Sequence, residues 1–200
     1  MLFFRHFWNL IYRPKATWRF VRKQKYGLRH CYFTQLSWLA AVPSVSFYIG
    51  TTQMGWSVRA GDYHTLAHET AWSLSVALYV SIIAFVTLLA LATYLFGRVY
   101  GAKTTFRNSM VLATFVVAPM LGAGIVALLP AVWFVAIALL MAMGVALYLL
   151  FTGVPIMMKV SEERGMLFSF ALVTTAFMIK TLYFTLLAFM FVSWTSLTTM

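Results

Sequence analysis

Three long stretches without a charged side chain dominate the hydrophobic pattern of the chain. They cover residues 30–58, 70–97 and 108–158. A helix that crosses the hydrocarbon core of a bilayer needs about 20 mostly apolar residues. The third stretch is too long for one crossing, and the step Leu129–Pro130 within it predicts a hairpin of two spans. Another apolar run follows Arg164 and supplies a further span.

This pattern predicts an all-α polytopic membrane protein, with a five-transmembrane-helix bundle that is preceded by interfacial amphipathic helices. The predicted spans are approximately 32–49, 71–96, 109–128, 131–151 and 167–194. Residues 1–29 then form a basic arm, and residues 30–200 form the five-span domain. Pro43 lies inside the first span and predicts a kink there, because proline removes one helical hydrogen bond. The segment GTTQMGW, residues 50–56, is predicted to be a loop or a re-entrant turn.

Small side chains recur at helical spacing in two of the predicted spans, where they would let another helix approach closely. They are Ser73, Ala77, Ser81 and Ala84 in the second span, and Ala138, Ala142 and Ala146 in the fourth. Pro119, followed by Gly122 and Gly124, predicts a third span that bends and packs closely. Gly153 and Pro155 are predicted to lie in the linker after the fourth span.

The N-terminal segment separates apolar and basic side chains onto opposite helical faces. Residues 1–12 predict one amphipathic helix, and Pro14 suits the first turn of a second, in which Trp18 and Val21 share the apolar face. Such helices lie in the membrane interface with their cations toward the phosphates, and a solvated charged tail is the alternative. The predicted contacts with lipid headgroups are Arg5, Arg13, Lys15, Arg19, Arg22, Lys23 and Lys25.

Composition excludes an ordinary soluble domain. Charged residues make up 10% of the chain and hydrophobic ones 62%, whereas soluble domains have about 25% charged residues. The net charge is +11, yet thirteen of the fifteen basic residues fall on one side of the predicted topology. We therefore expect a basic face over anionic lipid, no nucleic-acid partner, and a cytoplasmic N-terminus with the C-terminus on the opposite side. Cys31 is the only cysteine, so an intrachain disulfide is excluded, and no cleaved signal peptide is expected.

Lys180 is the sharpest candidate for a functional side chain. It lies near the middle of the fifth predicted span, where a charge costs roughly 2.5–3.5 kcal/mol on insertion scales, and no acid lies at membrane depth to pair with it. We expect it to face the bundle interior or a crevice and to serve as an intramembrane polar site for an anion, a proton or a lipid headgroup. A lysine that only snorkels or stabilises the bundle is the alternative.

His64 and His68 are weaker candidates. Their spacing places them on one helical face beside Glu69, which suits zinc or copper. A third strong ligand is not evident, so polar surface is the preferred interpretation and no metal or cofactor is expected. The chain has no nucleotide-binding loop or hydrolase motif and only four acids, so we expect no enzymatic activity and no catalytic residues.

Four segments occur in an order and at spacings that are familiar. They are Trp8 with Pro14 six residues later, AAVPSVSFYIGTTQMGW (residues 40–56), VAPMLGAGIVALLP (117–130) and GVPIMMKVSEERG (153–165). Together they resemble the Yip1-domain family, in particular its bacterial YohC-like inner-membrane group. The resemblance implies a five-span integral membrane protein with a cytoplasmic N-terminus. Eukaryotic relatives act in vesicle trafficking with small GTPases of the Rab type, a role that does not carry over to a bacterium.

The leading functional hypothesis is a non-enzymatic membrane protein of the Yip1 type in the bacterial inner membrane, with a periplasmic C-terminus. It would organise the membrane, or bind anionic lipid headgroups and protein partners, and a homo-oligomer or another membrane protein is a possible partner. One alternative is a transporter or channel for a small solute, ion or lipid, which would use Lys180 and the proline-kinked spans. The other is an accessory subunit of a larger membrane complex.

Overall fold

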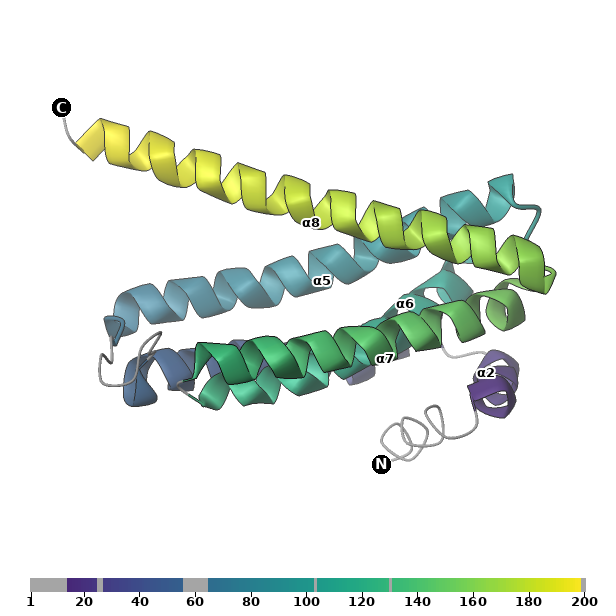
Figure 1. Ribbon diagram of the computed structural model, residues 1–200, viewed down its shortest axis with the longest axis horizontal. Helices are drawn as coiled ribbons and strands as arrows, with labels where there is room; N and C mark the ends of the chain where they lie inside the picture. Colours follow the sequence, from purple (N-terminus) through teal and green to yellow (C-terminus); the bar gives the residue numbers. More distant parts are fainter. Residues whose placement is uncertain (1–13, 25–26, 56–64, 103, 130, 199–200) are drawn as a thin grey trace.

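The computed structural model describes residues 14–24, 27–55, 65–102, 104–129 and 131–198, and every regular element within these ranges is a helix. The amphipathic helix that was predicted for residues 1–12 lies outside them. Four helical segments are long and apolar enough to cross a membrane. They are α5 (His68–Val99), α6 (Phe106–Ala123) continued by the 3₁₀ turn η3 (Gly124–Leu128), α7 (Val132–Met158) and α8 (Glu162–Thr198). The fold is therefore an all-helical membrane bundle, as the sequence predicts (Figure 1).

Residues 28–54 form another helical segment, in which α-helical and π-helical turns alternate without a break. Its parts are α3 (Leu28–His30), η1 (Cys31–Leu36), α4 (Ser37–Ile49) and η2 (Gly50–Met54). Pro43 lies inside α4, so the helix continues past the residue at which a kink was predicted.

The prediction of a loop or re-entrant turn at residues 50–56 is wrong for its first five residues. The helix continues to Met54 and ends at Gly55, whose φ of 73° closes it. The threonine hydroxyls are satisfied inside this helix, because they donate back to carbonyls of the preceding turn. The Thr51 hydroxyl lies 2.8 Å from the Phe47 carbonyl oxygen, and the Thr52 hydroxyl lies 2.7 Å from that of Tyr48.

Helix α6 forms the centre of the bundle. Every residue from Ser109 to Pro119 is buried, as expected for a helix that is apolar on all sides and has neighbours all round. Those neighbours are η1, α4, α5 and α7. In the other three long segments most of the apolar surface remains exposed and faces outward.

Glycine allows η3, which continues α6, to approach α4 and η2 closely. A Cβ atom added at Gly124 would lie 2.5 Å from the Cβ of Pro43, and one at Gly50 would overlap the carbonyl oxygen of Ala127. The predicted close packing of the third span is therefore confirmed at Gly124. A Cβ at Gly122 would meet nothing within 4 Å, so that glycine is not needed for packing.

Only one of the two predicted small-residue faces lies against a neighbouring helix of the chain. Ala142 and Ala146 of α7 are buried, whereas Ser73, Ala77 and Ala84 of α5 are exposed. The buried side of α5 instead includes Ala71, Ser75, Val86, Leu89, Ala90, Thr93 and Gly97. This face of α5 has no helix neighbour within the described chain, and because lipid and protein neighbours are both apolar, small size alone does not select the inward side.

Helix α7 is longer than the predicted fourth span, and α8 packs on the bundle only along part of its length. Helix α7 continues through Gly153 and Pro155 to Met158, so these residues do not form the predicted linker. Helix α8 buries Phe168, Ser169 and Leu172 in its first half. Figure 1 shows that α8 lies against the C-terminal part of α5 and then rises away from the bundle toward its own C-terminus.

Candidate functional site

Basic side chains gather at one end of the bundle. Figure 1 shows that α2 (Pro14–Lys23), the end of α5, the end of α7 and the start of α8 meet there. Nine of the ten Lys and Arg residues in the described part of the chain belong to this end: Lys15, Arg19, Arg22, Lys23, Arg29, Arg98, Arg107, Lys159 and Arg164. Two acids, Glu162 and Glu163, accompany them. We call this set of nine cations the basic end.

Helix α2 is held to the basic end by Trp18. Thr17, Trp18 and Val21 form its apolar side, and all three are buried. The Trp18 ring is fully buried and meets Phe115 edge-on, with 6.1 Å between ring centroids. A Cβ at Gly153 would lie 2.8 Å from two atoms of that ring, so the absence of a side chain at Gly153 makes room for the tryptophan.

Because α2 packs against α7, the prediction that its apolar face lies in the membrane interface is wrong. Helix α2 does begin at Pro14, but its apolar side is covered by the bundle and is not free to enter lipid. Arg19 and Lys23 remain exposed on its other side. The predicted headgroup contacts at Arg5, Arg13 and Lys25 lie outside the described residues.

Arg22 joins α2 to the C-terminus of α7. Its guanidinium donates a 2.6 Å hydrogen bond to the carbonyl oxygen of Ile156. Helix α7 stops at Lys159, which has left-handed backbone geometry with φ of 56°. The last carbonyls of a helix lack partners within the helix and carry partial negative charge, so a cation there is favourable.

An ion pair connects α2 to the start of α8. The Lys15 ammonium lies 3.2 Å from the Glu162 carboxylate, and both side chains are largely exposed. An exposed pair of this kind contributes little to stability, about 0–1 kcal/mol. Trp18 and Arg22 therefore hold α2 in place, while Lys15 remains available to other anions.

Lys180 lies away from the basic end, in the part of α8 that rises from the bundle. Its side chain is exposed, so it does not face the bundle interior as predicted. Within the described part of the chain it makes no hydrogen bond or ion pair. The acids of the whole sequence are Asp62, Glu69, Glu162 and Glu163, and none falls within a predicted span.

His68, the second candidate metal ligand, lies at the opposite end of the bundle from the basic residues. Its Nδ1 atom is 3.3 Å from the Tyr48 hydroxyl, and the Tyr48 ring meets Trp72 edge-on. His64 lies outside the described residues, so the predicted pair cannot be placed together. Among the described residues no group of three or more His, Cys, Asp or Glu side chains could hold a metal ion.

A family model described as the Yip1 domain matches residues 8–184. The chain belongs to the Yip1 domain family. The inner membrane protein YohC of Escherichia coli strain K12 is 30% identical to it over 164 residues, which cover 82% of this chain and 84% of that protein. The same protein from Escherichia coli strain O6:H1 gives the same identity and coverage. No solved structure matches the chain.

The matched region of this Yip1 domain includes a buried polar cluster that was not predicted. The Cys31 thiol lies 3.6 Å from the Gln35 side-chain oxygen and 3.9 Å from the Thr114 hydroxyl. Tyr32, which follows Cys31 in η1, has its hydroxyl 3.0 Å from that of Thr87 in α5. The sequence carried a signal for this cluster, because Gln35 is a polar side chain inside an apolar span and must find a partner there.

Proposed function

We propose that this Yip1 domain is a non-enzymatic protein of the bacterial inner membrane, whose basic end binds anionic lipid headgroups and so organises the lipid around it. The observation that carries the proposal is the packing of α2. Trp18 is fully buried against the bundle, and this holds a helix with exposed Arg19 and Lys23 at a fixed position. Cations near an anionic membrane surface contribute about 1 kcal/mol each.

The proposal includes five spans, with the basic end in the cytoplasm and the C-terminus in the periplasm. Residues 28–54 are the additional span beside the four long apolar segments, and at 1.5 Å per residue they measure about 40 Å. Support comes from the alternation visible in Figure 1, where consecutive long helices run in opposite directions between the basic end and the far end. Cytoplasmic segments carry the excess of Lys and Arg, which orients the basic end inward.

Lipid titration of the purified full-length protein, followed by native mass spectrometry, tests this function. We expect phosphatidylglycerol to bind in preference to phosphatidylcholine. The double variant Arg19→Gln/Lys23→Gln should weaken phosphatidylglycerol binding about 10- to 30-fold, because two surface cations are removed. It leaves Trp18 and Arg22 in place, so α2 stays packed.

Lys180→Gln is the matched control, since it removes a cation far from the basic end and should leave this binding unchanged. If the double variant binds phosphatidylglycerol as tightly as the wild type does, the basic end is not a lipid site.

A further inference from the structure

Residues 177–183 of α8 present several side chains that no other part of the described bundle covers. Phe168 and Leu172 near the start of α8 are fully buried, whereas Phe177, Met178 and Leu182 are each about three-fifths or more exposed. Lys180 lies between these residues in the sequence and is also exposed, and at 3.6 residues per turn Phe177 and Tyr183 are on its side of the helix. Figure 1 shows this stretch where the helix has separated from α5 and α7.

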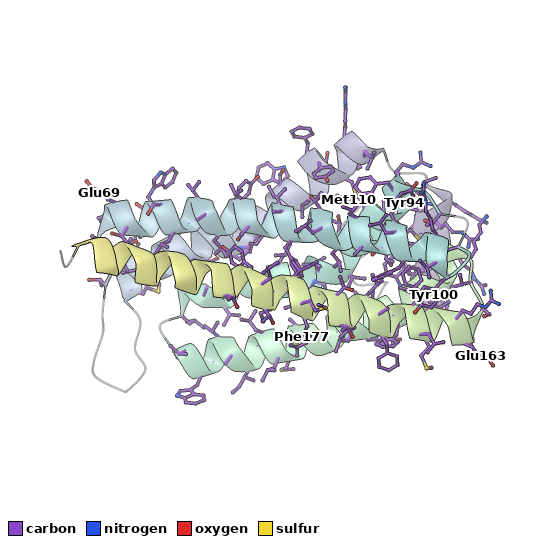
Figure 2. All side chains as sticks on the ribbon, turned by 90° about the horizontal axis from the view of Figure 1, so that it is seen from above. Glu69, Tyr94, Tyr100, Met110, Glu163 and Phe177 are labelled. Atoms are coloured by element: carbon purple, nitrogen blue, oxygen red, sulfur yellow. The ribbon has the colours of Figure 1, made fainter. Side chains whose placement is uncertain are left out.

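Lys180 lies at membrane depth. It is thirteen residues beyond Leu167, where the predicted span begins, which places it about 20 Å along the helix at 1.5 Å per residue. The hydrocarbon core is about 30 Å thick. Figure 2 agrees with this placement, because Phe177, one turn earlier, lies between Glu163 at one end of the bundle and Glu69 at the other.

The direction of the Lys180 side chain works against snorkelling to the nearer surface. In an α-helix each Cα–Cβ bond tilts toward the N-terminus of the helix, and long side chains follow it. For α8 that direction leads back toward the basic end and the centre of the membrane. A phosphate group of the outer lipid leaflet lies in the opposite direction.

The counter-charge for Lys180 has to come from another molecule. In the described part of the chain Lys180 has no hydrogen-bond or ion-pair partner. A second copy of this chain offers no carboxylate at that depth either, because all four acids lie outside the predicted spans. Ionisable side chains within spans are found paired or facing a polar site.

We propose that residues 177–183 of α8 dock a transmembrane helix of another protein, one that carries an Asp or Glu at the depth of Lys180. The carboxylate pairs with the Lys180 ammonium, and the exposed side chains of Phe177 and Tyr183, which lie on the same side of the helix as Lys180, pack beside the pair. Charge complementarity selects this partner over an apolar helix. The surface is separate from the basic end, so the docking does not depend on lipid binding there.

The test uses the full-length protein, labelled with a donor fluorophore at its N-terminus, in phosphatidylcholine vesicles. The probes are acceptor-labelled single-span peptides of Leu and Ala that differ only at one central residue, Glu or Gln. Energy transfer measures their association with the protein. We expect the Glu peptide to associate about three- to tenfold more tightly than the Gln peptide, the size typical of a polar pair between transmembrane helices.

Variants at Lys180 decide whether this preference arises at the proposed pair. Lys180→Gln should abolish the preference for the Glu peptide and Lys180→Arg should retain it, while Arg19→Gln/Lys23→Gln should leave it unchanged. Equal association of the two peptides with the wild-type protein, or a preference that survives in Lys180→Gln, overturns the proposal. It is also overturned if phosphatidylglycerol added to the vesicles binds through Lys180 and removes the preference, since the occupant is then a lipid.

Discussion

The packing of Trp18 against Gly153 predicts that two glycine-to-alanine changes in the same helix will have opposite effects. Gly144 and Gly153 both lie inside α7. A Cβ at position 144 would meet nothing within 4 Å, whereas one at position 153 would lie 2.8 Å from Trp18 and from the Cδ1 atom of Leu112. Ordinary contact between such carbon atoms is about 3.5–4.0 Å, so the tryptophan has to move.

The magnitude follows from two opposing terms. Alanine is favoured over glycine inside a helix by about 0.5–1 kcal/mol, and this gain applies at both positions. At Gly153 the extra methyl group also overpacks a filled site, which costs typically 1–3 kcal/mol. We therefore expect Gly144→Ala to stabilise by about 0.5–1 kcal/mol and Gly153→Ala to destabilise by about 1 kcal/mol, mainly by releasing α2.

Limited trypsin digestion in lipid nanodiscs measures the release of α2, because the helix contains exposed Lys15, Arg19 and Lys23. Cleavage of a helix that opens locally follows the population of the open form. A loss of 1 kcal/mol corresponds to cleavage about fivefold faster in Gly153→Ala, with no acceleration in Gly144→Ala. Unfolding in a detergent titration is the second measurement. If both variants are cleaved at the wild-type rate and unfold at the same detergent concentration as the wild type, Trp18 does not hold α2 as described.

Three further predictions concern a helix contact, a helix end and the topology. Gly124→Ala should destabilise the bundle by about 1–3 kcal/mol in detergent unfolding, because its methyl group would meet Pro43; Gly122→Ala is the control, and equal losses would contradict the described contact. Lys159→Gly should stabilise by about 0.5–1 kcal/mol in the same assay, since glycine adopts the left-handed geometry at the end of α7 without strain. Alkaline phosphatase fused after Met200 should be active, and a fluorescent protein that folds only in the cytoplasm should be dark at the same position. The reverse pattern would refute an odd number of spans.

The sequence allowed the ends of several elements to be predicted, because local chemistry determines them. Proline at position 14 starts α2, and η3 ends at Leu128, next to the predicted break. The inward side of α5 could not be predicted, since lipid and protein are both apolar and Ser73 and Ala77 are as small as Ala71 and Ser75. Helix α7 was predicted too short, because Gly153 and Pro155 were interpreted as breakers.

The candidate sites also show the difference between what local sequence determines and what three-dimensional packing determines. The sequence places all four acids outside the predicted spans, so no acidic partner for Lys180 is expected at membrane depth in its own chain. It does not show that Lys180 is exposed, because this depends on the angle at which α8 leaves the bundle. The contact between Trp18 and Gly153 joins residues far apart in sequence, and neither position identifies the other.

The burial of α6 from Ser109 to Pro119 has a consequence for biosynthesis. The central helix is neither the first nor the last to leave the ribosome, and its surface is shared between neighbours made before it and after it. A chain that stops after α6 leaves the side toward α7 uncovered. Before α7 is inserted, the chain therefore lacks a complete buried core. We expect the helices to assemble late and in one concerted step. C-terminal truncations should be degraded and should not accumulate as stable smaller bundles.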